Sequence, residues 1–318
     1  MTRFSFFADI HLSENTPRNR TDDYPQSLCD KLSEIYRISK ETGCAFVCCG
    51  GDIFDRYSVY SYKIVDHVIS VLDSSGLKTY TCLGEHDLRG HNGGTFDKST
   101  LGFVNKYCDS LSVVNAPVRA CDEVMLYAKH EFQTMEEAKK TVIDQSVFNV
   151  LLCHELLYDK KMPFATTFTG DLDLPFGLVC SGDLHSGFSP HKVKNTWYCN
   201  PGAAARKTVA EIKRKPKMLI IDVEPGYDPV IREEIIPHID GKNVFSIRLS
   251  DALIDTNTKM DIKDFKSGFD VLGGQRTDVY ALFEEYRKEH PVDKDVMAYY
   301  HTLRDKIEKE RKKDNDCL

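Results

Sequence analysis

The chain has 318 residues, of which 41% are hydrophobic and 29% are charged, and its formal net charge is −7. A chain of this length can bury a large core and exceeds a single small module, so we expect one large domain with a smaller one appended. The negative charge excludes a globally basic surface, so any contact with nucleic acid must come from a local basic patch.

The cysteines and the start of the chain bear on its location. The 11 cysteines are odd in number and follow no framework spacing, and the first residues show no signal-peptide pattern. We therefore expect a reducing, cytoplasmic location, with most cysteines packed in the core. No apolar run approaches the roughly 20 residues of a membrane-spanning helix, so we expect no membrane association.

Strand patterns alternate with helix patterns along the chain, which is typical of an α/β fold with a parallel sheet. We expect strands at residues 3–8, 45–49, 78–83, 111–114, 124–128, 147–153, 177–180, 197–200 and 217–223. Helices are expected around residues 28–38, 64–72 and 135–143. The stretch 88–99 has three glycines and no apolar periodicity, so we expect a long loop there.

The end of the chain differs in composition from the rest. Turn-forming residues at 225–229 suggest a linker, so we place the main domain at 1–224 and a capping region at 225–275, which includes a strand pair at 230–236 and 244–249. We expect residues 276–318 to form a charged helical tail, because their apolar residues recur at near-heptad spacing. This tail could dock onto a partner coiled coil, or it could pack on its own domain.

Titratable residues follow five successive predicted strands. They are Asp9, His11, Asp52, Glu85, His154, Asp183 and His185. A single such residue could simply cap a helix, but the carboxyl ends of parallel strands share one edge, so five endings of this kind favour a common site. Seven nitrogen and oxygen donors without a thiolate suit Mn²⁺, Mg²⁺, iron or Zn²⁺, and they are too many for one ion. We therefore expect a pair of metal ions that hydrolyses a phosphoester.

The motifs around these residues resemble those of the calcineurin-like metallophosphoesterases. In chain order they are Asp9-Ile10-His11, Gly51-Asp52-Ile53-Phe54-Asp55, Gly84-Glu85-His86-Asp87, His154 and Gly182-Asp183-Leu184-His185. A second element, Asn200-Pro201-Gly202 followed by residues 211–216, resembles the nuclease subunit of SbcCD-type complexes. The resemblance implies a two-sheet α/β sandwich flanked by helices, with a small α+β capping domain and a helical C-terminal tail.

The same resemblance implies roles for individual residues. Asp9, His11, Asp52 and His185 would hold one divalent ion, and Asp52, Glu85, His154 and Asp183 would hold the other. His86 would be the catalytic acid and Asp87 would orient its ring, although taken alone His86 could be a surface histidine. Glu85 stands where the family has Asn, and Asp183 stands where it has His. These added anions favour Mn²⁺, or else Mg²⁺, over Zn²⁺ and put binding of the second ion in question.

A run of basic residues follows the last motif. Arg206, Lys207, Lys213, Arg214 and Lys215 could form a DNA-contacting surface or a solvated face. We expect a DNA nuclease acting in repair, recombination or replication with an SbcC-like coiled-coil ABC ATPase. The alternatives are a small-substrate phosphodiesterase or phosphatase, and a DNA-end-binding scaffold with a weakened metal site. The sequence leaves the oligomeric state open, a homodimer included.

Overall fold

The computed structural model describes residues 1–162 and 167–246. The tail expected at 276–318 and most of the expected capping region lie outside these residues. The strands are β1 (Thr2–Phe7), β2 (Phe46–Cys49), β3 (Lys78–Thr81), β4 (Leu111–Val113), β5 (Val118–Cys121), β6 (Val124–Lys129), β7 (Phe148–Glu155), β8 (Leu157–Tyr158), β9 (Thr167–Phe168), β10 (Leu178–Asp183), β11 (Phe188–Val193), β12 (Thr196–Asn200), β13 (Lys217–Val223) and β14 (Val230–Ile235). The α-helices are α1 (Tyr24–Glu41), α2 (Tyr62–Ser75), α3 (Thr100–Tyr107), α4 (Met135–Lys139) and α5 (Gly241–Val244).

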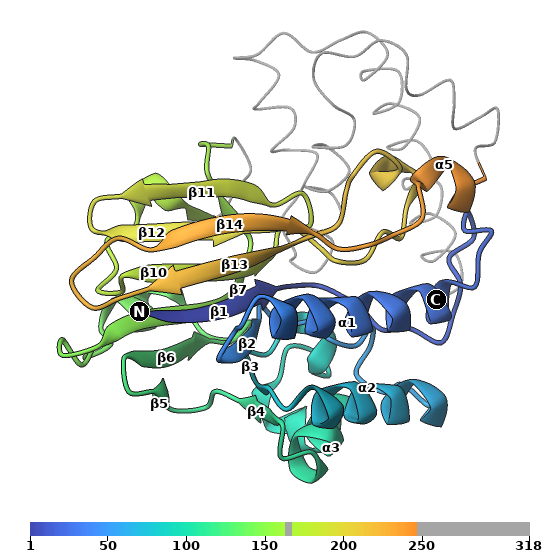
Figure 1. Ribbon diagram of the computed structural model, residues 1–318, viewed down its shortest axis with the longest axis horizontal. Helices are drawn as coiled ribbons and strands as arrows, with labels where there is room; N and C mark the ends of the chain where they lie inside the picture. Colours follow the sequence, from blue (N-terminus) through green and yellow to red (C-terminus); the bar gives the residue numbers. More distant parts are fainter. Residues whose placement is uncertain (163–166, 247–318) are drawn as a thin grey trace, which may run out of the picture. The chain divides into compact units, whose positions relative to one another are not determined.

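Two sheets dominate the described part of the chain (Figure 1). The first has the strand order β14-β13-β1-β2-β3-β4, and the second has the order β11-β12-β10-β7-β6-β5. Strands β1 to β4 pair in parallel, as do β6, β7, β10 and β12, so their carboxyl ends gather at a common edge of each sheet. This two-sheet α/β architecture with flanking helices is the fold class expected from the sequence.

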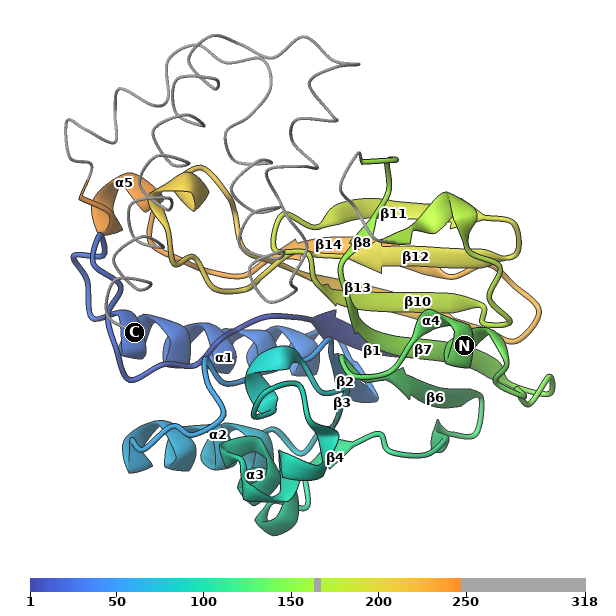
Figure 2. The ribbon, with the colours of Figure 1, turned by 180° about the vertical axis from the view of Figure 1, so that it is seen from behind.

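Alternation along the buried strands produces three apolar layers. Phe4 and Phe6 of β1 pack between the sheets, against Leu126 of β6 and Val150 of β7. Phe7, on the opposite face, packs in a cluster that includes residues of α1 and α2. A third cluster joins α4 to the outer face of the second sheet (Figure 2). Because β1, β2, β7 and β10 are covered on both faces, their sequences are nearly continuous apolar runs.

The structure corrects the expected domain boundary. Strand β14 pairs antiparallel with β13 from Asp222↔Val230 to Lys217↔Ile235, and the first compact unit runs from Met1 to Ser246. Residues 225–246 therefore belong to the main unit, because the turn at 225–229 joins neighbouring strands of one sheet. The first strand of the pair expected at 230–236 and 244–249 is present as β14, but it pairs with β13, and residues 247–249 of the second lie outside the described residues.

Some smaller features also differ from the expectation. The helix expected at 135–143 ends at Lys139, and the loop expected at 88–99 contains a 3₁₀ helix, Gly93–Lys98. Strands β5 and β11 lie mostly outside the cores and have no clear apolar pattern, so they were not anticipated. Within the described residues, no helix is both long and apolar enough to cross a membrane.

Candidate metal centre

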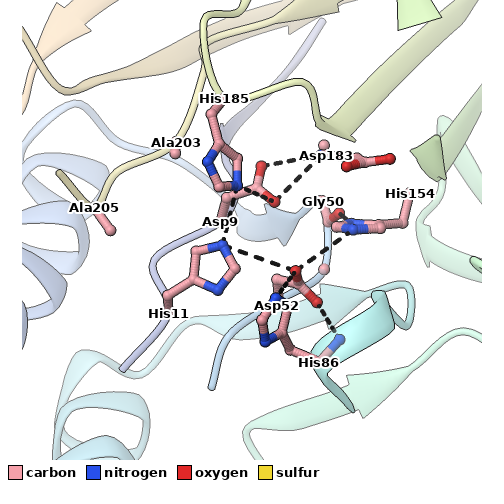
Figure 3. A network of polar contacts seen from close by, with 12 residues as sticks. Asp9, His11, Gly50, Asp52, His86, His154, Asp183, His185, Ala203 and Ala205 are labelled. Atoms are coloured by element: carbon pink, nitrogen blue, oxygen red, sulfur yellow. Dashed lines mark hydrogen bonds and ion pairs between the residues drawn. The ribbon is translucent and has the colours of Figure 1, made fainter. Parts of the chain in front are cut away.

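Five of the seven predicted ligands, Asp9, His11, Asp52, His154 and His185, come together at the carboxyl ends of the strands (Figure 3). Three groups of side chains have donor atoms within 4.8 Å of one another. The groups are Asp9 with His11 and His185, His11 with Asp52 and His86, and Asp9 with Asp52 and His154. Because Asp9, His11 and Asp52 each belong to two groups, the arrangement is one continuous cluster of carboxylates and imidazoles.

The backbone is strained where it presents these side chains. Asp9, His11, Asp52 and Asp183 have φ angles of 52°, 47°, 52° and 73°, in the left-handed region that residues other than glycine seldom adopt. Each such residue costs roughly 1 kcal/mol or more, so the surrounding structure must impose the conformation. Strain of this kind, concentrated on four candidate ligands, is typical of a functional site.

Two glycines make room for the cluster. A Cβ atom on Gly84 would lie 2.0 Å from Oδ1 of Asp52. A Cβ atom on Gly182 would lie 2.3 Å from the carbonyl oxygen of Gly50. Both contacts are far inside van der Waals distance, so the glycines of these motifs allow neighbouring strand ends to approach closely.

Asp52 lies at the centre of the cluster. Its Oδ2 atom is 3.6 Å from Nε2 of His154, 3.8 Å from Nε2 of His11 and 3.9 Å from Nε2 of His86. Its Oδ1 atom accepts a hydrogen bond of 3.0 Å from the main-chain N–H of His86. Burial raises the pKa of the Asp52 carboxyl to about 7. Asp52 belongs to two of the three groups, so it would serve as a shared ligand if two divalent ions were bound.

The histidines of the cluster have features that are typical of metal ligands. Nδ1 of His154 donates to the carbonyl oxygen of Gly50 at 2.8 Å, which fixes the ring and leaves Nε2 buried without a hydrogen-bond partner. A main-chain carbonyl commonly orients metal-ligating histidines in this way. Nε2 of His11 lies 3.2 Å from Nε2 of His185, so two acceptor nitrogens converge on one point. The donor set and the unpartnered nitrogen therefore fit divalent metal ions.

Glu85 and Asp183 belong to none of the three groups. The Glu85 side chain is 50% exposed, and its Oε1 atom lies 3.3 Å from Nε2 of His86. The main-chain N–H of Asp183 donates to both carboxylate oxygens of Asp9, at 3.2 and 3.1 Å. In Figure 3 the Asp183 carboxylate lies near His154, away from His11. Asp183 thus supports the cluster through its backbone, and Glu85 does so through His86.

His86 is oriented by a residue other than the one expected. Its Nδ1 atom contacts the main-chain carbonyl oxygen of Asp55, whereas Asp87 accepts hydrogen bonds from the main-chain N–H groups of Gly84 and Asp52. The expectation that Asp87 orients the His86 ring is therefore wrong, because its carboxylate is turned toward the two backbone segments. Asp55 orients the His86 ring through its main-chain carbonyl oxygen. Every residue has this group, so no sequence pattern predicts the contact.

The charge of His86 follows from its neighbours. Burial lowers the pKa of His86, but the carboxylates of Glu85 and Asp52 raise it more, to about 9. The imidazole is accordingly protonated at neutral pH in the metal-free protein. Such a group can donate a proton at the edge of the cluster.

Two of the five basic residues point inward. Arg206 is 2% exposed and donates to the carbonyl oxygens of Ile212, Arg214 and Ile239. Arg214 donates to the carbonyl oxygens of Ala203 and Ala205. The expectation that Arg206 and Arg214 contact DNA is wrong, because their guanidinium groups satisfy buried main-chain oxygens.

The three lysines of the run remain nearer the surface. Lys207 pairs with Asp55 beside the cluster, and its side chain is 32% exposed. Lys213 and Lys215 are exposed.

The fold and this cluster define a metal-dependent phosphoesterase. The profile of the calcineurin-like phosphoesterase family matches residues 2–187, which is more than half of the chain. The chain therefore belongs to the calcineurin-like phosphoesterase family, whose members bind two divalent metal ions and hydrolyse phosphoesters.

Comparison with solved structures gives distant similarities. A dimetal phosphatase from Danio rerio is 9% identical, with a TM-score of 0.46, over 75% of this chain and 99% of that one. The protein TT1561 of Thermus thermophilus is 8% identical, with a TM-score of 0.47, over 74% and 99%. A purple acid phosphatase from yellow lupin seeds is 13% identical, with a TM-score of 0.46, over 81% and 57%. No curated protein matches the sequence.

Proposed function

We propose that this member of the family is a DNA nuclease that uses two divalent ions, Mn²⁺ in the first place. The observation that supports hydrolysis most strongly is the Asp52 carboxylate, whose Oδ2 atom lies within 3.9 Å of three imidazole nitrogens. Asp9, His11, Asp52 and His185 would hold one ion, and Asp9, Asp52 and His154 would hold the other. When bound, the ions would supply Lewis acidity toward the phosphoryl group and the attacking water.

In this proposal His86 is the general acid. Its Nδ1 atom is engaged by Asp55, so the proton on Nε2 is the one available to the leaving oxygen. Glu85 lies against that same nitrogen and favours the protonated ring. Asp9 is held by the backbone of Asp183, which keeps its carboxylate facing the cluster.

The choice of DNA as substrate rests on the sequence resemblance at 200–202 and 211–216. Exposed Lys213 and Lys215, with Lys207 beside the site, offer positive charge for a phosphate backbone. We further propose an SbcC-like ATPase partner and a cytoplasmic location. A small-substrate phosphodiesterase or phosphatase is the second candidate, and the inward direction of Arg206 and Arg214 favours it. A DNA-end-binding scaffold is the third.

The test is a hydrolysis assay on single- and double-stranded DNA with Mn²⁺, Mg²⁺ or Zn²⁺, beside bis-p-nitrophenyl phosphate. Cleavage of DNA that is strongest with Mn²⁺ supports the nuclease. Cleavage of the small ester alone supports the second candidate, and DNA binding without any hydrolysis supports the scaffold. His86→Ala should abolish hydrolysis and keep the metal, while His67→Ala, on α2, is the matched control.

A further inference from the structure

Lys31 of α1 is buried against the loop that follows β12. The residue is 2% exposed, and its Nζ atom donates a 2.9 Å hydrogen bond to the main-chain carbonyl oxygen of Ala204. An ammonium group removed from water is costly unless acceptors surround it. A buried lysine that binds a main-chain oxygen therefore fixes the position of that segment.

The segment 203–205 in turn holds two of the proposed ligands. Its three N–H groups donate, in order, to the carbonyl oxygens of His185 at 3.0 Å, Ala8 at 3.0 Å and Asp9 at 3.2 Å. Ala203 lies next to His185 in Figure 3. Lys31 thus acts on Asp9 and His185 through one intervening strip of backbone.

Two arginines complete this support. Arg214 donates to the carbonyl oxygens on either side of Ala204, and Arg20 donates to that of Arg206 at 2.9 Å. Four consecutive carbonyl oxygens, 203–206, are therefore bound by buried or half-buried basic side chains. Lys31 contacts the middle of the segment, so its removal should loosen the strip that carries Asp9 and His185.

A second buried lysine lies behind His154. Lys129, the last residue of β6, is 2% exposed and is paired in register with Cys153 of β7. Its Nζ atom donates to the carbonyl oxygen of His154 at 3.0 Å and also contacts the Glu155 carboxylate. The lysine therefore fixes the end of β7 at the residue whose imidazole faces Asp52.

We propose that Lys31 and Lys129 are positioning residues, each of which supports one of the two metal sites. Lys31 supports the site of Asp9, His11 and His185, and Lys129 supports the site that includes His154. Neither lysine contacts the ligand atoms themselves. The proposal rests on metal binding by the cluster, and it is independent of whether the substrate is DNA.

The experiment is a calorimetric titration of the metal-free protein with Mn²⁺. His185→Ala and His154→Ala first establish which binding step belongs to which site. Lys31→Met should weaken the step lost in His185→Ala about tenfold, since outer partners of metal ligands commonly contribute that much. It should weaken the other step less, because the two sites share Asp9 but not His185. Lys129→Met should weaken the step lost in His154→Ala by a similar factor.

Exposed lysines provide the matched controls. Lys40→Met on α1 and Lys140→Met after α4 should leave both steps unchanged. If a Met variant does not fold, the corresponding Gln variant, whose shorter side chain does not reach the carbonyl, should show the same selective loss. Equal weakening of both steps by each variant, or lower thermal stability with unchanged titrations, would overturn the proposal. These titrations measure metal binding alone, so they test the proposal even if the protein does not cleave DNA.

Discussion

Metal binding should release protons from the cluster, because several ligands carry protons in the metal-free protein. Burial lowers the pKa of His154, but Asp52, Asp183 and Asp9 raise it more, to about 10. Burial raises the pKa of Asp52 to about 7 and that of Asp9 to about 6. These ligands must lose their protons before they can bind a cation.

The expected number follows from the three pKa values. At pH 7, His154 is almost fully protonated, Asp52 is about half protonated, and Asp9 is about one-tenth protonated, by the ordinary titration relation. Saturation with Mn²⁺ should therefore release about one and a half protons per chain. His86, with a pKa of about 9, should keep its proton because it is assigned to acid catalysis.

The assay is titration calorimetry with Mn²⁺ at pH 7 in two buffers that differ in ionisation enthalpy. The difference between the apparent enthalpies gives the number of protons released. A release of about two and a half protons that falls to about one and a half in His86→Ala would mean that His86 is a ligand, as its group with His11 and Asp52 permits. A release near zero would refute the reasoning, because the ligands would then be unprotonated before the metal binds.

Three further predictions address other features of the site. Glu85→Gln should lower the pKa of His86, because it removes a carboxylate that favours the protonated ring. The alkaline limb of the profile of kcat against pH should then move to lower pH, and an unmoved limb would exclude His86 as the general acid. Gly84→Ala should destabilise the fold by about 3 kcal/mol in denaturant unfolding, because its Cβ would overlap Asp52, and an effect no larger than that of Gly94→Ala would contradict this packing. The metal-free protein should lose stability as pH rises from 4 to 7, because the raised pKa values of Asp9 and Asp52 make the folded state bind more protons than the unfolded chain. Denaturant unfolding in EDTA at pH 5 and pH 8 measures this difference, and greater stability at pH 8 would contradict the prediction.

The sequence predicts the sheets and the edge of the site well, for a physical reason. Strands buried on both faces have continuous apolar runs, and polar residues directly after them must lie at the carboxyl edge. The sequence pattern therefore predicts that Asp9, Asp52, His154 and His185 lie close together at this edge. It also explains why β5 and β11, which lie at the outer edges of the second sheet, were not anticipated.

The direction in which a side chain turns is not contained in such patterns. Asp183 follows its strand as expected, but its carboxylate belongs to none of the three groups of donors. Asp87 and Arg206 form hydrogen bonds with main-chain groups. Every residue carries such groups, so no sequence pattern indicates these contacts. A basic run is equally compatible with a solvated face, a DNA surface or buried supports, so only the fold shows that Arg206 and Arg214 are supports.

The central claim is that Asp52 joins two metal sites that together hydrolyse phosphoesters. The most direct measurement is the metal content and the hydrolysis of bis-p-nitrophenyl phosphate for the Mn²⁺-loaded protein, the metal-free protein and Asp52→Ala. We predict two ions per chain and hydrolysis only in the loaded protein, with both ions and all activity lost in Asp52→Ala. Hydrolysis by the metal-free protein, or two ions retained in Asp52→Ala, would contradict the claim.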